Sequence, residues 1–183
     1  MKKLLLIPLL CISLNSCIVA VTAIGATAII ERKAIQQHFS NYDIGFHISN
    51  TIFGNKQLYG DNHIVVTVNN GEVLLVGQVR NEHYRQEVID IVKNTSGVTK
   101  IYDQLKIGPP TSRSQRLQDT GISARISSEI SSNTRAKVIV TTENSIVYLM
   151  GTVTREQSEQ ATHYARTTNG VLQVIKIFNY TSA

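Results

Sequence analysis

Cys17 is the residue whose surrounding sequence most clearly indicates a chemical modification in this chain of 183 residues. A basic pair, Lys2 and Lys3, precedes a short apolar run at residues 4–12, and the small Ser16 stands directly before the cysteine. A positive start, a short apolar centre and a small residue at the cleavage point are typical of a secretory signal peptide, which the mature protein loses. The pattern predicts that residues 1–16 are removed, so that the mature chain begins at a cysteine whose thiol can be modified.

The tetrapeptide Leu14-Asn15-Ser16-Cys17 resembles the lipobox of bacterial lipoproteins, although Asn15 departs from the small apolar or hydroxylated residue that is more common there. The resemblance implies that the Cys17 thiol takes a diacylglycerol and that the new α-amino group is acylated. Ile18 follows, whereas an Asp there would imply retention in the inner membrane. The resemblance therefore implies a protein anchored in the outer membrane and facing the periplasm, with this covalent lipid and no cofactor.

An uncleaved membrane anchor is the alternative interpretation of the N-terminus. Residues 4–30 are nearly all apolar, and about 20 such residues span a bilayer core about 30 Å thick. Residues 18–30 are rich in Ala, Val and Thr with Gly25 in the middle, a composition with weak helix propensity. We therefore expect residues 17–40 to form a lipidated apolar segment that lies on or dips into the membrane.

Composition limits the function classes. The chain is 42% hydrophobic and 17% charged, which suits folded domains and argues against bulk disorder. The formal net charge of +5 falls to +3 once Lys2 and Lys3 leave with the signal, which is too little for a nucleic-acid-binding protein. Cys11 also lies in the signal, so acylated Cys17 would leave the mature protein without a disulfide.

An internal repeat organises the rest of the chain into two domains, residues 41–109 and residues 119–183, with a linker at residues 110–118 that lacks apolar periodicity. Each copy opens with three isoleucines spaced four apart, which predicts a helix with one apolar face: Ile44, Ile48 and Ile52, then Ile122, Ile126 and Ile130. Strands are predicted at residues 64–68, 72–79 and 100–107, and at residues 138–142, 146–153 and 173–180. Helices are predicted at residues 82–95 and 156–168.

The order helix, strand, strand, helix, strand predicts an α+β fold for each copy. Asn70-Gly71 is a strong signal for a tight hairpin turn, whereas the second copy has Asn144-Ser145 and no glycine. The last strand returns by a right-handed crossover and so runs parallel to the strand before the helix. Each copy is then an αββαβ two-layer sandwich with a three-stranded mixed sheet. A domain of about 65 residues buries only about 60% of its unfolded surface, so we expect the two domains to pack together.

The two hairpin segments carry a family resemblance. Residues 73–79, VLLVGQV, and residues 140–153, VTTENSIVYLMGTV, resemble BON domains. Together with the lipobox, the chain as a whole is similar to the dual-BON outer-membrane lipoproteins. The resemblance implies binding of anionic phospholipid and a role in outer-membrane integrity.

No catalytic motif is found in the sequence. An enzyme would show a nucleophile beside a base, paired carboxylates or ligands at metal spacing. The histidines His38, His47, His63, His83 and His163 are scattered and form no HExxH motif. We therefore expect neither a catalytic site nor a metal site.

Basic side chains concentrate between residues 110 and 140, where only Asp119 and Glu129 oppose them. Each cation near an anionic bilayer contributes up to about 1 kcal/mol, screened by salt. The candidate phospholipid-binding residues are Arg113, Arg116, Arg125, Arg135 and Lys137. Ordinary solvated charges are the alternative interpretation. Because the chain has no Trp, Tyr148 and Tyr164 are the candidates for rings at the membrane interface, although either could equally cap the core.

A membrane-tethered adaptor is the second functional hypothesis. In that case the sheet edges or helices of the two domains would bind an envelope protein or assembly, and contact with lipid would follow only from the tether. Binding to head groups should fall with salt and require anionic lipid, whereas an adaptor should co-purify with its partner after the membrane is dissolved. No nucleic-acid partner is expected in either case.

Overall fold

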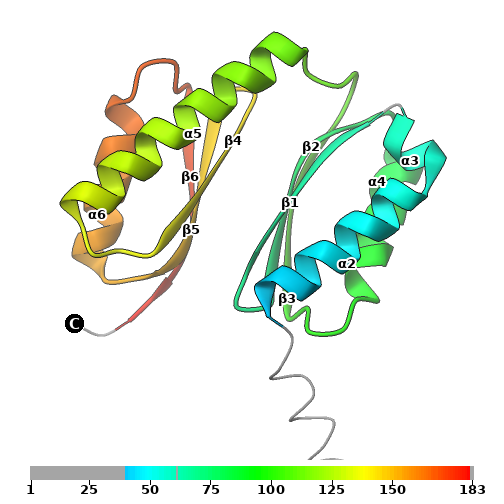
Figure 1. The fold of residues 1–183 in the computed structure, drawn as a ribbon, viewed down its shortest axis with the longest axis horizontal. Helices are drawn as coiled ribbons and strands as arrows, with labels where there is room; N and C mark the ends of the chain where they lie inside the picture. Colours follow the sequence, from blue (N-terminus) through cyan, green and yellow to red (C-terminus); the bar gives the residue numbers. More distant parts are fainter. Residues whose placement is uncertain (1–39, 61, 182–183) are drawn as a thin grey trace, which may run out of the picture. The chain divides into compact units, whose positions relative to one another are not determined.

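Two α+β domains follow one another in the computed structural model, which describes residues 40–60 and 62–181 (Figure 1). The predicted signal peptide and the predicted lipidated segment lie outside the described residues, apart from Ser40. Within the described part of the chain, no helix has both the length and the apolar character needed to cross a membrane.

The first domain confirms the predicted order and adds one short helix. Its elements are α2 (Asn41–Gly54), α3 (Lys56–Gly60), β1 (His63–Asn69), β2 (Glu72–Val79), α4 (Glu82–Lys93) and β3 (Lys100–Ile107). Helix α2 begins with a capping box, in which Ser40 and Asp43 exchange hydrogen bonds. Helix α3 was not expected, because five residues around the buried Leu58 are too few to show a period. Strand β2 is central, antiparallel to β1 and parallel to β3.

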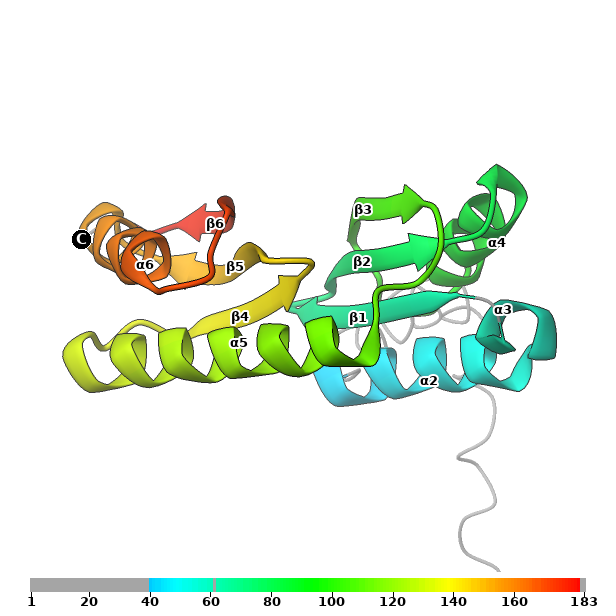
Figure 2. The same cartoon turned by 90° about the horizontal axis from the view of Figure 1, so that it is seen from above.

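The second domain repeats this topology with α5 (Arg113–Asn133), β4 (Val138–Glu143), β5 (Ile146–Val153), α6 (Arg155–Thr167) and β6 (Gln173–Tyr180). Strand β5 is central, antiparallel to β4 and parallel to β6. Helix α5 runs beside β4 (Figure 2). It begins at Arg113, so residues 113–118 of the predicted linker are helical and continue into the first helix of the second domain. The cause is local, because the Ser112 hydroxyl accepts a hydrogen bond from the Gln115 N–H and caps the helix early.

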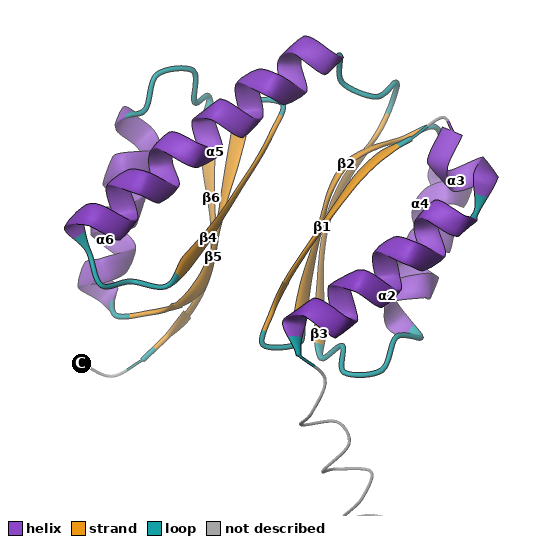
Figure 3. Ribbon diagram, viewed as in Figure 1, coloured by secondary structure: helices purple, strands orange, loops and turns teal. Residues whose placement is uncertain are grey.

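The two long helices of each domain, α2 with α4 and α5 with α6, cover the same face of its sheet, as predicted (Figure 3). The isoleucines of α2 pack with the buried side chains of α4 and of the facing side of β2. In the second domain, the isoleucines of α5 form a separate cluster with β5 and with Ala161 and Ala165 of α6. Each domain therefore has its own two-layer core.

A third apolar cluster joins the two sheets on the faces that the helices leave open. Along β2, Val73 and Leu75 point into the first core, while Leu74 and Val76 belong to the third cluster. Their partners there are Tyr148 and Met150 of β5 and Ile177 of β6. This cluster confirms the expected packing of the two domains, and it buries β2 on both faces.

The two hairpin turns have the same backbone conformation, although only the first contains a glycine. Asn70 and Gly71 have φ values of 52° and 77°, and Asn144 and Ser145 have φ values of 50° and 63°. Two successive positive φ angles define the type I′ turn, which strains a residue other than glycine. The carboxylate of Asp119, only 2% exposed, accepts hydrogen bonds from the N–H groups of Asn144 at 2.8 Å and Ser145 at 2.9 Å. The hydrogen bonds to Asp119 thus stabilise a turn conformation that has no glycine to favour it.

Replacing Asp119 with alanine is expected to lower the free energy of unfolding by about 2 kcal/mol, because two turn N–H groups lose their acceptor. Adding Ser145→Gly to this variant should recover part of the loss, since glycine adopts a positive φ without strain. Urea unfolding of the wild type, the single variant and the double variant measures both effects. A single variant as stable as the wild type would contradict the role given to Asp119.

Candidate functional site

The five predicted basic residues come from α5 and from the loop that follows it, but they do not gather at one place. Arg113 and Arg116 lie in the first turn of α5, whereas Arg125 lies in its middle. At 1.5 Å of rise per residue, Arg113 and Arg125 are about 18 Å apart along the helix axis. Arg135 and Lys137 lie between α5 and β4. The structure therefore spreads the five predicted residues along α5 and the loop after it.

Three of the five, Arg125 in the second half of α5 and Arg135 and Lys137 in the loop after it, are exposed to solvent and are here called the basic trio. Across residues 40–60 and 62–181, no ion pair connects these three side chains to an acidic group. Glu129, one turn after Arg125, instead accepts a hydrogen bond from the Asn133 side-chain amide. The basic trio can therefore bind an anion without first breaking an ion pair to a described residue.

Arg116 takes part in a polar network between the domains. Its Nη1 donates to Nδ1 of His63 at 3.3 Å, which assigns the ring proton to Nε2. That Nε2 donates to Oε2 of Glu143 at 3.2 Å. Oε1 of the same carboxylate accepts from Gln78 at 2.8 Å and from Thr111 at 3.0 Å. The network connects β1, β2, the chain before α5, α5 itself and β4.

Glu143 is the buried charge at the centre of this network, with 5% of its surface exposed. Burial raises the pKa of its carboxyl, but the hydrogen bonds from His63, Gln78 and Thr111 together lower it by more, so the pKa lies below its usual value. A buried carboxylate with several donors fixes the position of its neighbours. We interpret Glu143 as a structural junction between the two sheets.

The stability that Glu143 contributes should depend on pH. Because its pKa is lowered by folding, this contribution is complete above the pKa of the unfolded chain, about 4.3. It is lost as the pH falls through the lower pKa of the folded chain. Urea midpoints of the wild type and Glu143→Gln, measured from pH 6 down to pH 3, should therefore converge as the pH falls. A constant difference over that range would contradict this role.

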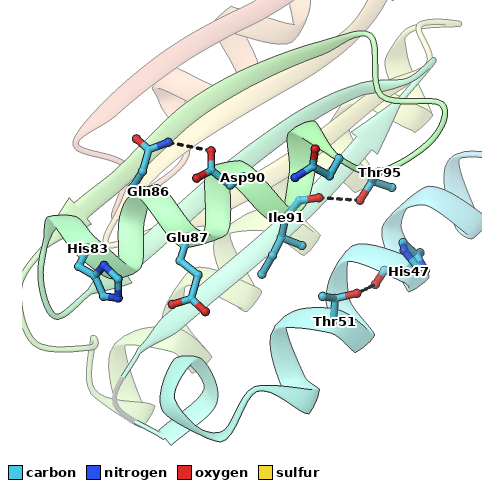
Figure 4. Close-up of a pocket in the computed structure, with 9 residues that line it drawn as sticks. His47, Thr51, His83, Gln86, Glu87, Asp90, Ile91 and Thr95 are labelled. Carbon is cyan, nitrogen blue, oxygen red and sulfur yellow. Dashed lines mark hydrogen bonds between the residues drawn. The ribbon is translucent and has the colours of Figure 1, made fainter.

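A groove of about 490 Å³ lies between α2 and α4 (Figure 4). Glu87 and Asp90 of α4 line it together with His47 and His83, and no Lys or Arg is among the described lining residues. Glu87 accepts from the Asn55 amide. Two carboxylates and no fixed cation make this groove unsuited to an anionic ligand.

A second cavity, of about 500 Å³, has the opposite character. Phe53 of α2 and Tyr59 of α3 line one part of it, and Pro110, Arg113 and Arg116 line another. None of its described lining residues is acidic. Aromatic and guanidinium groups that line one cavity can receive both the apolar and the anionic parts of an amphipathic ligand.

The tyrosines and histidines singled out in the sequence do not lie together at one site. Tyr148 is buried in the third apolar cluster, so of its two predicted places the core is the one it occupies and the membrane interface is excluded. Tyr164 is half-buried on α6. His163 is exposed on α6, while Cys17 and His38 lie outside the described residues. In the described part of the chain, no group of three or more His, Cys, Asp or Glu side chains is arranged to hold a metal ion. Sequence reasoning missed the Glu143 network and the exposed aromatic side chains of α2, although the spacing of Tyr42 and Phe46 could have indicated the latter.

Comparisons with known proteins agree with the repeat. The chain is 29% identical over 186 residues to the outer membrane lipoprotein DolP of Haemophilus influenzae, covering 98% of this chain and 96% of that protein. It is 34% identical over 127 residues to a 21 kDa hemolysin of Actinobacillus pleuropneumoniae, covering 68% of this chain and 66% of that protein. A solved structure of CdsD, a structural protein of the type III secretion system of Chlamydia trachomatis, matches with 13% identity and a TM-score of 0.32, covering 76% of this chain and 93% of that one. The BON domain model matches residues 48–109 and 118–181, so the chain belongs to the BON-domain family and carries two copies of the domain.

Proposed function

We propose that this protein is anchored in the outer membrane by acyl groups on Cys17, faces the periplasm, and binds anionic phospholipid through its BON domains to help maintain outer-membrane integrity. The lipobox and the similarity to an outer membrane lipoprotein over 98% of the chain support the location. The observation that carries the binding proposal is the basic trio, three exposed cations without an acidic partner among the described residues. No catalytic step is proposed.

Because the proposed acyl anchor already holds the protein at the membrane, weak binding of the basic trio to lipid head groups is sufficient for recognition. Three cations near an anionic surface contribute together up to about 3 kcal/mol, which alone gives only weak binding. Acyl chains on the same molecule would keep the domains at a high effective concentration beside the bilayer. The basic trio would then respond to the local density of anionic head groups.

Charge reversal of the basic trio tests the site. Both domain cores and the cluster between them lie within residues 40–181, so residues 40–183 retain every described core contact. In sedimentation with anionic vesicles, Arg125→Glu, Arg135→Glu and Lys137→Glu together should weaken binding of residues 40–183 by at least about 100-fold, because three attractions of about 1 kcal/mol each become repulsions.

The matched control reverses three other exposed cations of the same domain, Arg155, Arg166 and Lys176, and so changes the net charge equally. The control should bind nearly as well as the wild type. Equal losses in the two variants would reveal a dependence on net charge alone and would exclude the basic trio as the site.

The second candidate function is an adaptor that binds an envelope protein. It is favoured by the sheet edges, since within residues 40–60 and 62–181 the edge strands β1 and β3 pair only with β2, and β4 and β6 only with β5. An edge strand can accept a further strand from a partner. Recovery of one stoichiometric protein partner after detergent solubilisation, together with no binding of residues 40–183 to vesicles, would favour the adaptor.

A further inference from the structure

Four large aromatic side chains are exposed on the first two helices of the first domain. Tyr42, Phe46 and Phe53 lie on α2 and Tyr59 on α3, with exposed fractions between 54% and 74%. At about 100° per residue, the three on α2 fall within about 40° of one another around the helix, away from its buried isoleucines. The rings of Tyr42 and Phe46 stack at 5.9 Å, and those of Phe53 and Tyr59 meet edge to face at 5.4 Å. We call these four residues the aromatic stripe.

The internal repeat shows that the fold does not require the stripe. Aligned by the buried isoleucines of α2 and α5, Tyr42 corresponds to Thr120, Phe46 to Ala124 and Phe53 to Ser131. These three residues of α5 are also exposed. The same helix position in the same fold is thus occupied by small or polar side chains. A group of exposed rings on one copy alone indicates an interaction surface.

The charges at one end of the stripe favour an anionic partner. At its Phe53 and Tyr59 end, the stripe borders the cavity that Arg113 and Arg116 also line. The single acidic residue of α2, Asp43, accepts hydrogen bonds from Ser40 at the helix start. Guanidinium groups bind phosphate through paired hydrogen bonds, and aromatic rings favour the boundary between water and lipid.

We propose that the aromatic stripe is a bilayer-docking face, on which α2 lies along the phospholipid surface with Arg113 and Arg116 at the phosphates. This inference rests on the proposed lipid anchor and places a second lipid contact apart from the basic trio. The position of α2 in the chain supports it, because only residues 18–39 separate Cys17 from the start of the described structure. Those 22 residues reach at most about 75 Å when extended, so acyl chains at Cys17 would keep α2 close to the bilayer.

A single cysteine beside the stripe tests the proposal. Ser49 lies on α2 between Phe46 and Phe53, and Ser49→Cys leaves all four rings in place. Cys11 leaves with the signal and Cys17 is acylated in the proposed mature protein, so the new cysteine is the only thiol to label. The full-length protein, labelled with a polarity-sensitive fluorophore, is reconstituted into phosphatidylethanolamine and phosphatidylglycerol vesicles. Gln160→Cys, on the exposed side of α6, serves as the reference.

The Ser49→Cys label is expected to be quenched by a spin-labelled lipid and protected several-fold from aqueous iodide, while the Gln160→Cys label should show the reverse. The second copy supplies a matched variant, Tyr42→Thr with Phe46→Ala and Phe53→Ser, which should make the Ser49→Cys label as accessible to iodide as the reference. Its urea midpoint checks that it is folded.

Two results would overturn the proposal. Equal iodide access for the Ser49→Cys and Gln160→Cys labels would show that α2 does not contact the bilayer. Protection from both quenchers would show that protein covers the stripe, either another part of this chain or a second copy. Mass spectrometry of the same sample reports whether Cys17 is acylated, and vesicle binding of the basic trio variant is measured separately. These two measurements test the proposed function by themselves. A failure of the stripe to contact the bilayer is therefore distinguishable from a failure of the proposed function.

Discussion

Replacing Cys17 with serine is expected to abolish fatty-acid incorporation and to remove the protein from the outer-membrane fraction almost completely. A serine hydroxyl cannot form the thioether that the lipobox resemblance implies. Each buried methylene of an acyl chain contributes about 0.8 kcal/mol, so two or more chains hold a protein on a bilayer for any practical time. This is the largest single effect that we expect. Membrane fractionation and intact-mass analysis of the purified protein measure it.

Cys11→Ser is the matched control, because Cys11 lies inside the predicted signal and should not affect the mature protein. A wild-type mass without acyl groups, but with residues 1–16 still attached, would contradict the lipoprotein interpretation. That outcome would establish the uncleaved anchor in its place.

Gly77→Ala is expected to destabilise the first domain by about 3 kcal/mol or more. Gly77 has a φ of 124°, which side-chain-bearing residues rarely adopt, and a Cβ there would stand 2.0 Å from the carbonyl oxygen of His63. The oxygen belongs to the backbone of β1, and the Cβ would be bonded directly to the backbone of β2. Because these two strands are paired, neither backbone can move without breaking the pairing. Backbone strain costs about 1–3 kcal/mol and overpacking costs a similar amount, and both lower the free energy of unfolding of the variant.

Gly151 is the equivalent residue of the second copy and provides the comparison. A Cβ at Gly151 would stand 2.5 Å from the carbonyl oxygen of Lys137, and its φ is outside the positive range. Gly151→Ala should therefore cost less than Gly77→Ala. Urea unfolding of both variants checks the order. A Gly77→Ala protein with wild-type stability would show that the close approach of β1 and β2 is relaxed in solution.

The fold was predictable because each element leaves a local signal in the sequence. Isoleucines four residues apart predict α2 and α5, and Asn70-Gly71 predicts the first hairpin. The start of α5 was not predictable in the same way, because Leu117 is exposed and the first turns of the helix show no apolar period. The one local signal for the N-terminus of α5 is the capping side chain of Ser112.

The contacts between distant residues could not be predicted. His63 and Glu143 are 80 positions apart and come from different copies of the domain, so no spacing rule relates them. The burial of Tyr148 has the same origin, because the third cluster exists only once the two sheets meet. Sequence reasoning identified the basic residues by type, but the length of α5 separates Arg113 and Arg116 from the basic trio.

The most direct test of the account is sedimentation of residues 40–183 with neutral and with anionic phospholipid vesicles, at low and at moderate salt. If the folded domains recognise anionic phospholipid, they bind to anionic vesicles alone, and this binding weakens as salt screens the charges. Binding to neither kind of vesicle, or equal binding to both at all salt concentrations, would contradict recognition of anionic phospholipid by the folded domains.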